Sequence, residues 1–236
     1  MKTILALDTT SPTGSVALYA QGQLQGEVLL HLKTTHAERL LGAVDQLLNG
    51  VGVSLGDLDA LAVVRGPGSF TGLRVGMATA KGLALSLERP LVGISTLEAL
   101  AYNVPFASMQ VCALLDARKN EVYAGLYRFE SGRMQPVGDE QVVAPEKLLA
   151  ALDTETLFVG DGAQRYRSLI VRQMGARAHF VPAPLNQPRA AMVAWLAESK
   201  LDEPLPPADA LTPVYIRPSE AELSFIARED STSIEG

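Results

Sequence analysis

The chain of 236 residues is long enough to form one large domain or two small lobes with a sizeable buried core. Hydrophobic residues make up 47% of the chain and charged residues only 19%, which excludes the composition of an intrinsically disordered protein. The net charge of −6 argues against an extended nucleic-acid surface, because such surfaces depend on clustered Lys and Arg. We therefore expect a globular protein that does not bind nucleic acid strongly by itself.

Cysteine usage and hydropathy indicate the compartment. The single cysteine, Cys112, excludes an intramolecular disulfide, and its apolar neighbours predict a buried strand. The first residues lack the long apolar core of an export signal, and no uninterrupted apolar stretch approaches about 18 residues. We expect a cytoplasmic protein with no membrane partner.

The first part of the chain predicts a strand meander followed by alternating helices and strands. Short β-prone runs are separated by turn residues, and the helical segments repeat apolar residues with the spacing of one helix face. Thr35 and Glu38 fit a capping box at the start of the first helix. The expected elements are strands at 3–8, 15–19, 23–30, 60–64 and 91–94 and helices at 36–48 and 72–87.

The same kind of pattern restarts near Val104 and Pro105, which predicts a second lobe of related layout. Its expected elements are strands at 110–116, 121–129, 157–159 and 179–181 and helices at 145–152, 163–174 and 188–199. We therefore predict an α/β protein in which each lobe has a mixed sheet flanked by helices. The predicted boundaries are a first lobe at 1–104, a second lobe at 105–217 and a loose polar tail at 218–236.

A glycine-rich segment, RGPGSFTGLRVGMATAKGLA, follows the strand at 60–64. Such a loop before a helix can offer backbone N–H groups to a phosphate. However, it lacks the lysine of a P-loop and the third glycine of the dinucleotide fingerprint. A phosphate site therefore stays open as an alternative for the loop residues Arg65, Gly66, Pro67, Gly68, Ser69 and Phe70.

Small residues recur every four positions further along this segment, at Gly72, Gly76, Ala80 and Ala84, so one helix face has almost no side chain. This face packs either on the protein's own core or on another chain. We favour another chain, because Leu41 and Leu48 of the first helix predict extra exposed apolar surface beside it. The predicted partner-binding residues are His36, Arg39, Leu40, Gly72, Arg74, Val75, Gly76, Thr79, Ala80 and Leu83.

Polar residues at strand ends are the candidates for chemistry. A carboxylate followed by hydroxyls can hold a magnesium-bound phosphate or can simply close a turn, and both interpretations stay open. A stand-alone ATPase or kinase using Asp8, Thr10 and Asp116 is therefore the alternative function. The three histidines have no metal-ligand spacing, so no metal site is expected. The candidates for a vestigial nucleotide cleft are Asp8, Thr9, Thr10, Asp116, Gly160, Asp161 and Gly162.

Several runs in the chain resemble the TsaB (YeaZ) family of bacterial proteins over most of its length. They are ILALDTTSPTGSVALY, THAERLL, VVRGPGSFTGLRVGMATAKGLA, PLVGISTLEALA, LLDARKNEVYAGLY and VGDGAQRY. The resemblance implies an actin-like ATPase fold of the ASKHA, ribonuclease H-like type. It also implies a role in making N6-threonylcarbamoyladenosine (t6A) at position 37 of tRNAs that read ANN codons.

The resemblance further implies a non-catalytic subunit. Such a subunit pairs with the catalytic paralogue TsaD, recruits the small ATPase TsaE, and forms a homodimer through the first-lobe helices when alone. Where the paralogue has two metal-binding histidines, this chain has Ile-Ser-Thr-Leu-Glu-Ala-Leu at 94–100, and His36 alone matches a histidine that the paralogue keeps. We expect no cofactor on this chain alone, with ATP or ADP at the partner interface, and no support for older peptidase labels.

Overall fold

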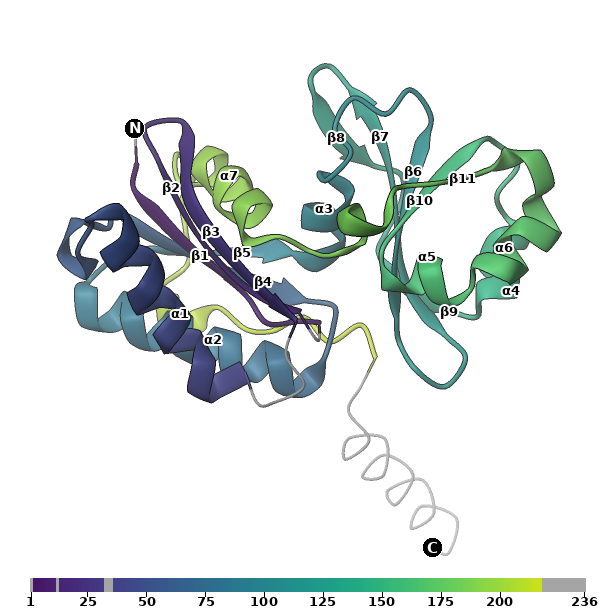
Figure 1. Cartoon of the computed structure of the whole chain (residues 1–236). Helices are drawn as coiled ribbons and strands as arrows, with labels where there is room; N and C mark the ends of the chain where they lie inside the picture. Colours follow the sequence, from purple (N-terminus) through teal and green to yellow (C-terminus); the bar gives the residue numbers. More distant parts are fainter. Residues whose placement is uncertain (1, 12, 32–35, 218–236) are drawn as a thin grey trace, which may run out of the picture.

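Figure 1 shows a computed structural model of two lobes, each built on one β-sheet; it describes residues 2–11, 13–31 and 36–217. The first sheet has the strand order β3-β2-β1-β4-β5. Its first three strands are antiparallel neighbours and the last two run parallel to β1, as the predicted meander and the following strands require. The strands are β1 (Ile4–Asp8), β2 (Thr13–Ala20), β3 (Gln23–His31), β4 (Ala60–Gly66) and β5 (Leu91–Ser95).

Two helices, α1 (His36–Val51) and α2 (Phe70–Leu87), pack on one face of this sheet. The helix spacing read from the sequence is confirmed, because Leu40, Val44 and Leu47 of α1 are buried in the core beneath it. The predicted capping residue Thr35 lies outside the described residues. No helix in the described part of the chain is both long and apolar enough to cross a membrane.

The second sheet repeats the layout of the first. Its order is β11-β10-β6-β7-β8, with β9 added beside β7, so three antiparallel strands again neighbour two parallel ones. The strands are β6 (Gln110–Asp116), β7 (Val122–Glu130), β8 (Arg133–Pro136), β9 (Gln141–Val143), β10 (Thr156–Val159) and β11 (Ala178–Phe180). The two lobes of related layout predicted from the sequence are therefore confirmed.

The remaining helices and two of the strands differ in detail from the prediction. The expected helix at 163–174 is two helices that meet at Tyr166, and β8, β9 and α3 were not predicted. The α-helices are α3 (Thr96–Ala101), α4 (Pro145–Ala150), α5 (Asp161–Arg165), α6 (Arg167–Met174) and α7 (Ala190–Lys200). Short 3-10 turns lie at η1 (Leu55–Asp57), η2 (Gly175–Arg177), η3 (Ala183–Asn186) and η4 (Ala208–Ala210).

Helix α7 packs on the first sheet, although its place in the chain predicted that it belongs to the second lobe. It contacts β1, β2, β4 and β5 and covers the face opposite α1 and α2 (Figure 1). Its buried residues surround most of the helix, and they join Leu97 and Leu100 of α3 in a core that continues into the second sheet. The predicted second lobe at 105–217 therefore needs correction, because α7 within it packs on the first sheet.

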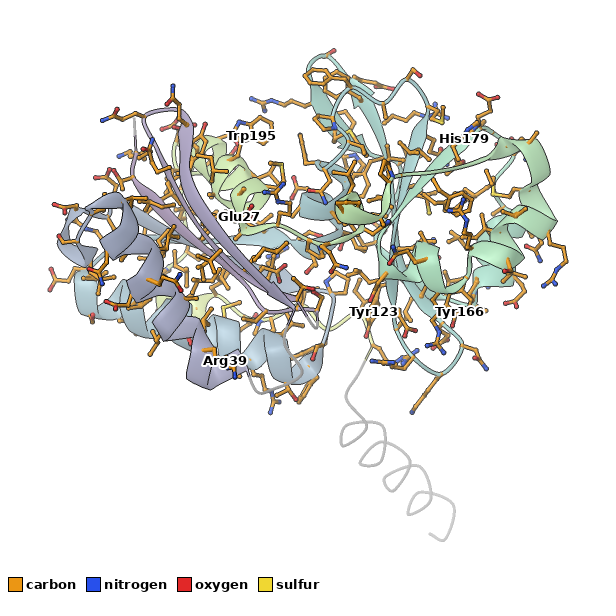
Figure 2. The ribbon with its side chains drawn as sticks, in the orientation of Figure 1. Glu27, Arg39, Tyr123, Tyr166, His179 and Trp195 are labelled. Atoms are coloured by element: carbon orange, nitrogen blue, oxygen red, sulfur yellow. The ribbon has the colours of Figure 1, made fainter. Side chains whose placement is uncertain are left out.

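The first N–H groups of α7 donate hydrogen bonds to polar side chains of the first sheet, and Figure 2 labels one of these side chains, Glu27. The N–H of Ala190 donates to Ser15 Oγ at 3.0 Å, and that of Ala191 donates to Glu27 Oε1 at 3.0 Å. Glu27 also accepts from Arg189 Nε at 2.9 Å. Because the first N–H groups of a helix have no partner within it, these acceptors fix α7 on the sheet.

We expect Glu27→Ala to destabilise the protein by about 2 kcal/mol. The change leaves the N–H of Ala191 buried without an acceptor and removes the partner of Arg189, whose partial exposure moderates the cost. Urea unfolding measures the effect, with Glu146→Ala on exposed α4 surface as the control. A loss below about 0.5 kcal/mol would mean that these contacts do not hold α7.

The segment after α7 runs along α2 and then crosses to the second lobe (Figure 1). Leu211 is buried in the first core, and Lys81 Nζ donates to Asp209 O at 2.8 Å. Further on, the N–H of Val214 donates to Arg65 O at 2.6 Å. The side chain of Arg217 then donates to Ala117 O of the second lobe at 2.7 Å. This segment thus links the glycine loop to the second lobe.

Candidate functional site

The turn after β1 encloses the carboxylate of Asp8. Asp8 has no exposed surface, and its Oδ1 accepts from Thr10 N at 2.8 Å and from Thr10 Oγ1 at 2.6 Å. Its Oδ2 is also buried and has no hydrogen-bond partner within the part of the chain that the structure describes. Burial raises the pKa of Asp8 from its ordinary 3.8 to about 6, although the bonds from Thr10 oppose the rise. A carboxylate in this setting closes its own turn.

The glycine loop at 65–70 lies directly on this turn. The N–H of Ser69 donates to Thr10 O at 2.8 Å, and Thr9 Oγ1 donates to Gly72 O at 2.7 Å. Ser69 caps α2 by accepting from the N–H of Gly72 at 3.3 Å. Two N–H groups that a phosphate would need at this helix start therefore have partners inside the chain.

Close backbone contact explains why glycines stand here. A Cβ on Gly72 would overlap the carbonyl oxygen of Thr9, and one on Gly68 would lie 2.7 Å from Thr10 Cβ. Gly66 adopts φ +119° and faces the carbonyl of Val214. Of the other loop residues, Arg65, Ser69 and Phe70 are exposed and Pro67 is buried. The glycines thus let three backbone segments meet.

The prediction that the small-residue face of α2 is free for another chain is wrong. Gly72, Gly76, Ala80 and Ala84 are all buried, and a Cβ on Gly76 would overlap Thr9 Oγ1. This face packs on the β1 turn and on the core of its own lobe. The reason is that Thr9 projects toward α2, and only small residues leave room for it.

The remaining predicted partner-binding residues differ in how far their side chains are exposed to solvent. Arg39 lies exposed on α1 (Figure 2) and Arg74 lies exposed on α2, while Leu40 is a core residue. Val75, Thr79 and Leu83 are half-buried. The side chain of His36 is outside the described part. Leu48 is buried, contrary to the expectation, and Leu41 is 54% exposed.

The second-lobe candidates gather where β6 ends. Asp161 Oδ1 accepts from the N–H of Asp116 at 3.0 Å, and burial raises the pKa of Asp161. Asp116 Oδ2 lies 3.4 Å from both Arg118 and Arg165. These contacts bring together Asp116 and Asp161, two of the cleft candidates, and place Arg118 and Arg165 beside them.

The two glycines beside Asp161 serve packing. A Cβ on Gly160 would overlap the carbonyl oxygen of Leu114, and one on Gly162 would lie 3.0 Å from it. The N–H of Gly160 donates to the buried Asn186 Oδ1 at 2.8 Å. Among the described residues, no three His, Cys, Asp or Glu side chains are grouped so as to hold a metal ion.

Sequence reasoning missed the polar junction at Glu27 and the return of residues 208–217 to α2. It also missed a partly buried junction in which Tyr127 OH donates to Glu140 Oε1 at 2.8 Å and Ser95 Oγ bonds the same oxygen. The strand β3 around Glu27 offered one signal, a charged residue inside an otherwise strand-like run. The other contacts join residues far apart in the chain, for which the sequence has no local signal.

The repeated sheet order, with helices over both faces of the first sheet and a shared core at the lobe junction, defines an actin-like ATPase fold. Comparisons with known proteins agree with this class. The family model for TsaD, described as tRNA N6-adenosine threonylcarbamoyltransferase, matches residues 29–225.

The relatives define the family. The TsaB protein of Bacillus subtilis, a tRNA threonylcarbamoyladenosine biosynthesis protein, is 34% identical over 95% of this chain and 98% of its own length. The Escherichia coli TsaB protein is 40% identical over 70% of this chain and 74% of its own length. The structure of YeaZ from Pseudomonas aeruginosa has a TM-score of 0.76 at 35% identity, covering 91% of this chain and all of that one. The chain belongs to the TsaB family.

Proposed function

We propose that this protein is the non-catalytic partner subunit of the cytoplasmic complex that transfers threonylcarbamoyl to A37 of ANN-decoding tRNAs. In this proposal it docks and supports the catalytic subunit TsaD and recruits the ATPase TsaE. The names of its relatives and the match to the TsaD model support this assignment to t6A biosynthesis. When alone, the chain forms a homodimer through the surface that otherwise receives TsaD.

The observation that supports a non-catalytic role is the closed turn at Asp8. Its carboxylate is fully buried, the N–H of Ser69 in the glycine loop donates to Thr10 O, and Thr9 Oγ1 donates to Gly72 O near the start of α2. A catalytic phosphate site needs open N–H groups and an ionised, accessible carboxylate for magnesium. We therefore place any ATP or ADP at the boundary with the partner.

The outer side of α1 and α2 is the proposed docking surface, in place of the buried small-residue face. Leu41 is 54% exposed and Leu85 58% exposed. Gly42 and Gly82 stand in helix interiors, and a Cβ on either would meet nothing within 4 Å. A helical glycine costs about 1 kcal/mol relative to alanine, and this fold gives no packing reason for either one. A second chain approaching closely would supply that reason.

A bulky side chain on this surface tests the proposal. We expect Gly82→Leu to leave the monomer folded and to weaken both self-association and TsaD pairing by about 30-fold or more, since it obstructs a close contact. Sedimentation velocity and co-purification with TsaD measure pairing, and tRNA modification with and without the chain measures function. Gln173→Leu, on exposed α6 surface, is the matched control. Unchanged pairing of Gly82→Leu would exclude this surface.

Calorimetry separates this proposal from a stand-alone ATPase. The purified chain is titrated with Mg-ATP, and hydrolysis is followed in the native protein and in Asp8→Ala. Micromolar binding, with hydrolysis that Asp8→Ala abolishes, would favour the enzyme and contradict the accessory role.

A further inference from the structure

Five cationic residues that are far apart in the sequence lie on one continuous band, which we call the cationic band. Its members are Arg74, Arg118, Lys119, Arg165 and Arg217. Arg74 Nε donates to Tyr215 OH at 3.4 Å, and Arg217, two residues later, donates to Ala117 O at 2.7 Å. Arg118 and Lys119 follow Ala117 directly. The segment ending at Arg217 thus joins cations of α2 to those of the second lobe.

Two arginines of the band face solvent more than the acid that lies beside them both. Arg118 is 77% exposed and Arg165 50%, whereas Asp116, which lies 3.4 Å from both, is only 9% exposed. Arg217 pairs with Glu121 and is itself only 18% exposed, so it joins the two ends of the band more than it adds outward charge. Arg118, Lys119 and Asn120 have φ of 61°, 50° and 59°, values uncommon for residues with a Cβ. Arg118 and Lys119 are both exposed, and the loop that carries them has a costly backbone conformation.

Aromatic rings border the band at the first lobe. The guanidinium of Arg74 lies 3.9 Å above the centre of the Phe70 ring, and the Phe70 and Tyr215 rings are 5.1 Å apart. Phe70 is also partly exposed. RNA-binding surfaces combine exposed cations for phosphates with aromatic rings and guanidinium planes on which unpaired bases stack. An acidic protein segment would need the cations but not the stack.

We propose that the cationic band binds the phosphate backbone of the tRNA on which the complex acts, with the group at Phe70, Arg74 and Tyr215 beside an unpaired base. This inference rests on the proposed function and gives the accessory subunit a direct share in substrate binding. It agrees with the net charge of −6, because that value averages over the whole surface whereas phosphate contacts depend on local clustering. We therefore expect the isolated chain to bind tRNA only modestly.

The test removes two outward cations from the full-length chain in its complex with TsaD. We expect Arg118→Ala with Arg165→Ala to weaken binding of an unmodified ANN-decoding tRNA transcript about 10-fold at moderate salt. The slope of log Kd against log salt should fall by roughly 1 to 2, since each phosphate contact contributes a little less than one. The matched control is Arg133→Ala with Arg172→Ala, which removes two exposed arginines outside the band.

Three results would overturn the inference. They are equal tRNA affinity of the double variant and the native complex, an equal loss in the control, and no tRNA binding by the native complex at low salt. Polyglutamate is the competitor probe: a band variant that loses polyglutamate or TsaD binding but keeps tRNA binding would mark a protein interface instead. The proposed function fails separately, if tRNA modification proceeds equally with and without this chain, so the two outcomes are distinguishable.

Discussion

Gly72→Ala should destabilise the protein by more than about 4 kcal/mol, a loss that is exceptional for one methyl group. The added Cβ would overlap the carbonyl oxygen of Thr9, and this oxygen belongs to the backbone that follows β1. A backbone carbonyl cannot rotate away from the overlap as the end of a flexible side chain can. Relief would require separating α2 from the turn, which breaks the bond from Thr9 Oγ1 to Gly72 O and exposes part of the core.

The same substitution at an exposed position of this helix is the control. Gly82 also lies within α2, but its Cβ position is open, so we expect Gly82→Ala to stabilise the isolated chain by about 0.5 to 1 kcal/mol. Urea unfolding compares the pair, and the yield of soluble folded protein is the readout if Gly72→Ala does not fold. Similar stability of the two variants would mean that the contact with Thr9 does not constrain the fold.

The order of strands and helices could be predicted from the sequence because it depends on local periodicity. Leu40, Val44 and Leu47 of α1 show the helical spacing, and the runs at Ile4–Asp8 and Gln110–Asp116 show continuous buried strand. The repeat of this order in the second half was enough to predict two related lobes. Local periodicity does not predict the sheet on which a helix packs, as α7 shows.

Helix α7 is buried on most sides, so its apolar pattern does not say which sheet it covers. The acceptors that place it, Ser15 and Glu27, stand more than 160 positions earlier in the chain. The repeat of Gly72, Gly76 and Ala80 likewise predicted a close neighbour correctly but not its identity. That neighbour is Thr9 of the same chain.

In the candidate site, too, features that are local in the sequence could be predicted, whereas contacts between distant residues could not. The sequence singled out Asp8 and Asp116 because each stands at a strand end, and Asp161 because it precedes a helix; the structure brings Asp116 and Asp161 together. It could not show that the loop starting at Arg65 covers Asp8, nor that Arg118, Arg165 and Arg217 converge on one edge. Those arrangements depend on the fold as a whole.

Asp8→Asn should change how stability depends on pH. The pKa of Asp8 is about 6 in the folded protein and about 3.8 when exposed, because burial opposes ionisation and nearby Glu27 adds to the effect. The folded state therefore holds a proton that the unfolded state releases, and the native protein loses stability as pH rises from about 4 to about 6. A pKa rise of this size corresponds to about 3 kcal/mol, and asparagine cannot ionise, so the variant should escape this loss.

The measurement compares the free energy of unfolding of the native chain and Asp8→Asn at pH 4 and pH 7. The variant's stability relative to the native chain should rise by about 2 to 3 kcal/mol between these pH values, whatever constant cost its amide carries. That cost exists because the amide nitrogen would take the place of Oδ2, which has no partner among the described residues. Asp202→Asn, on the exposed surface, controls for the charge itself. A pH dependence unchanged by Asp8→Asn would show that this carboxylate ionises as freely as one in water, and that the glycine loop does not close the turn in solution.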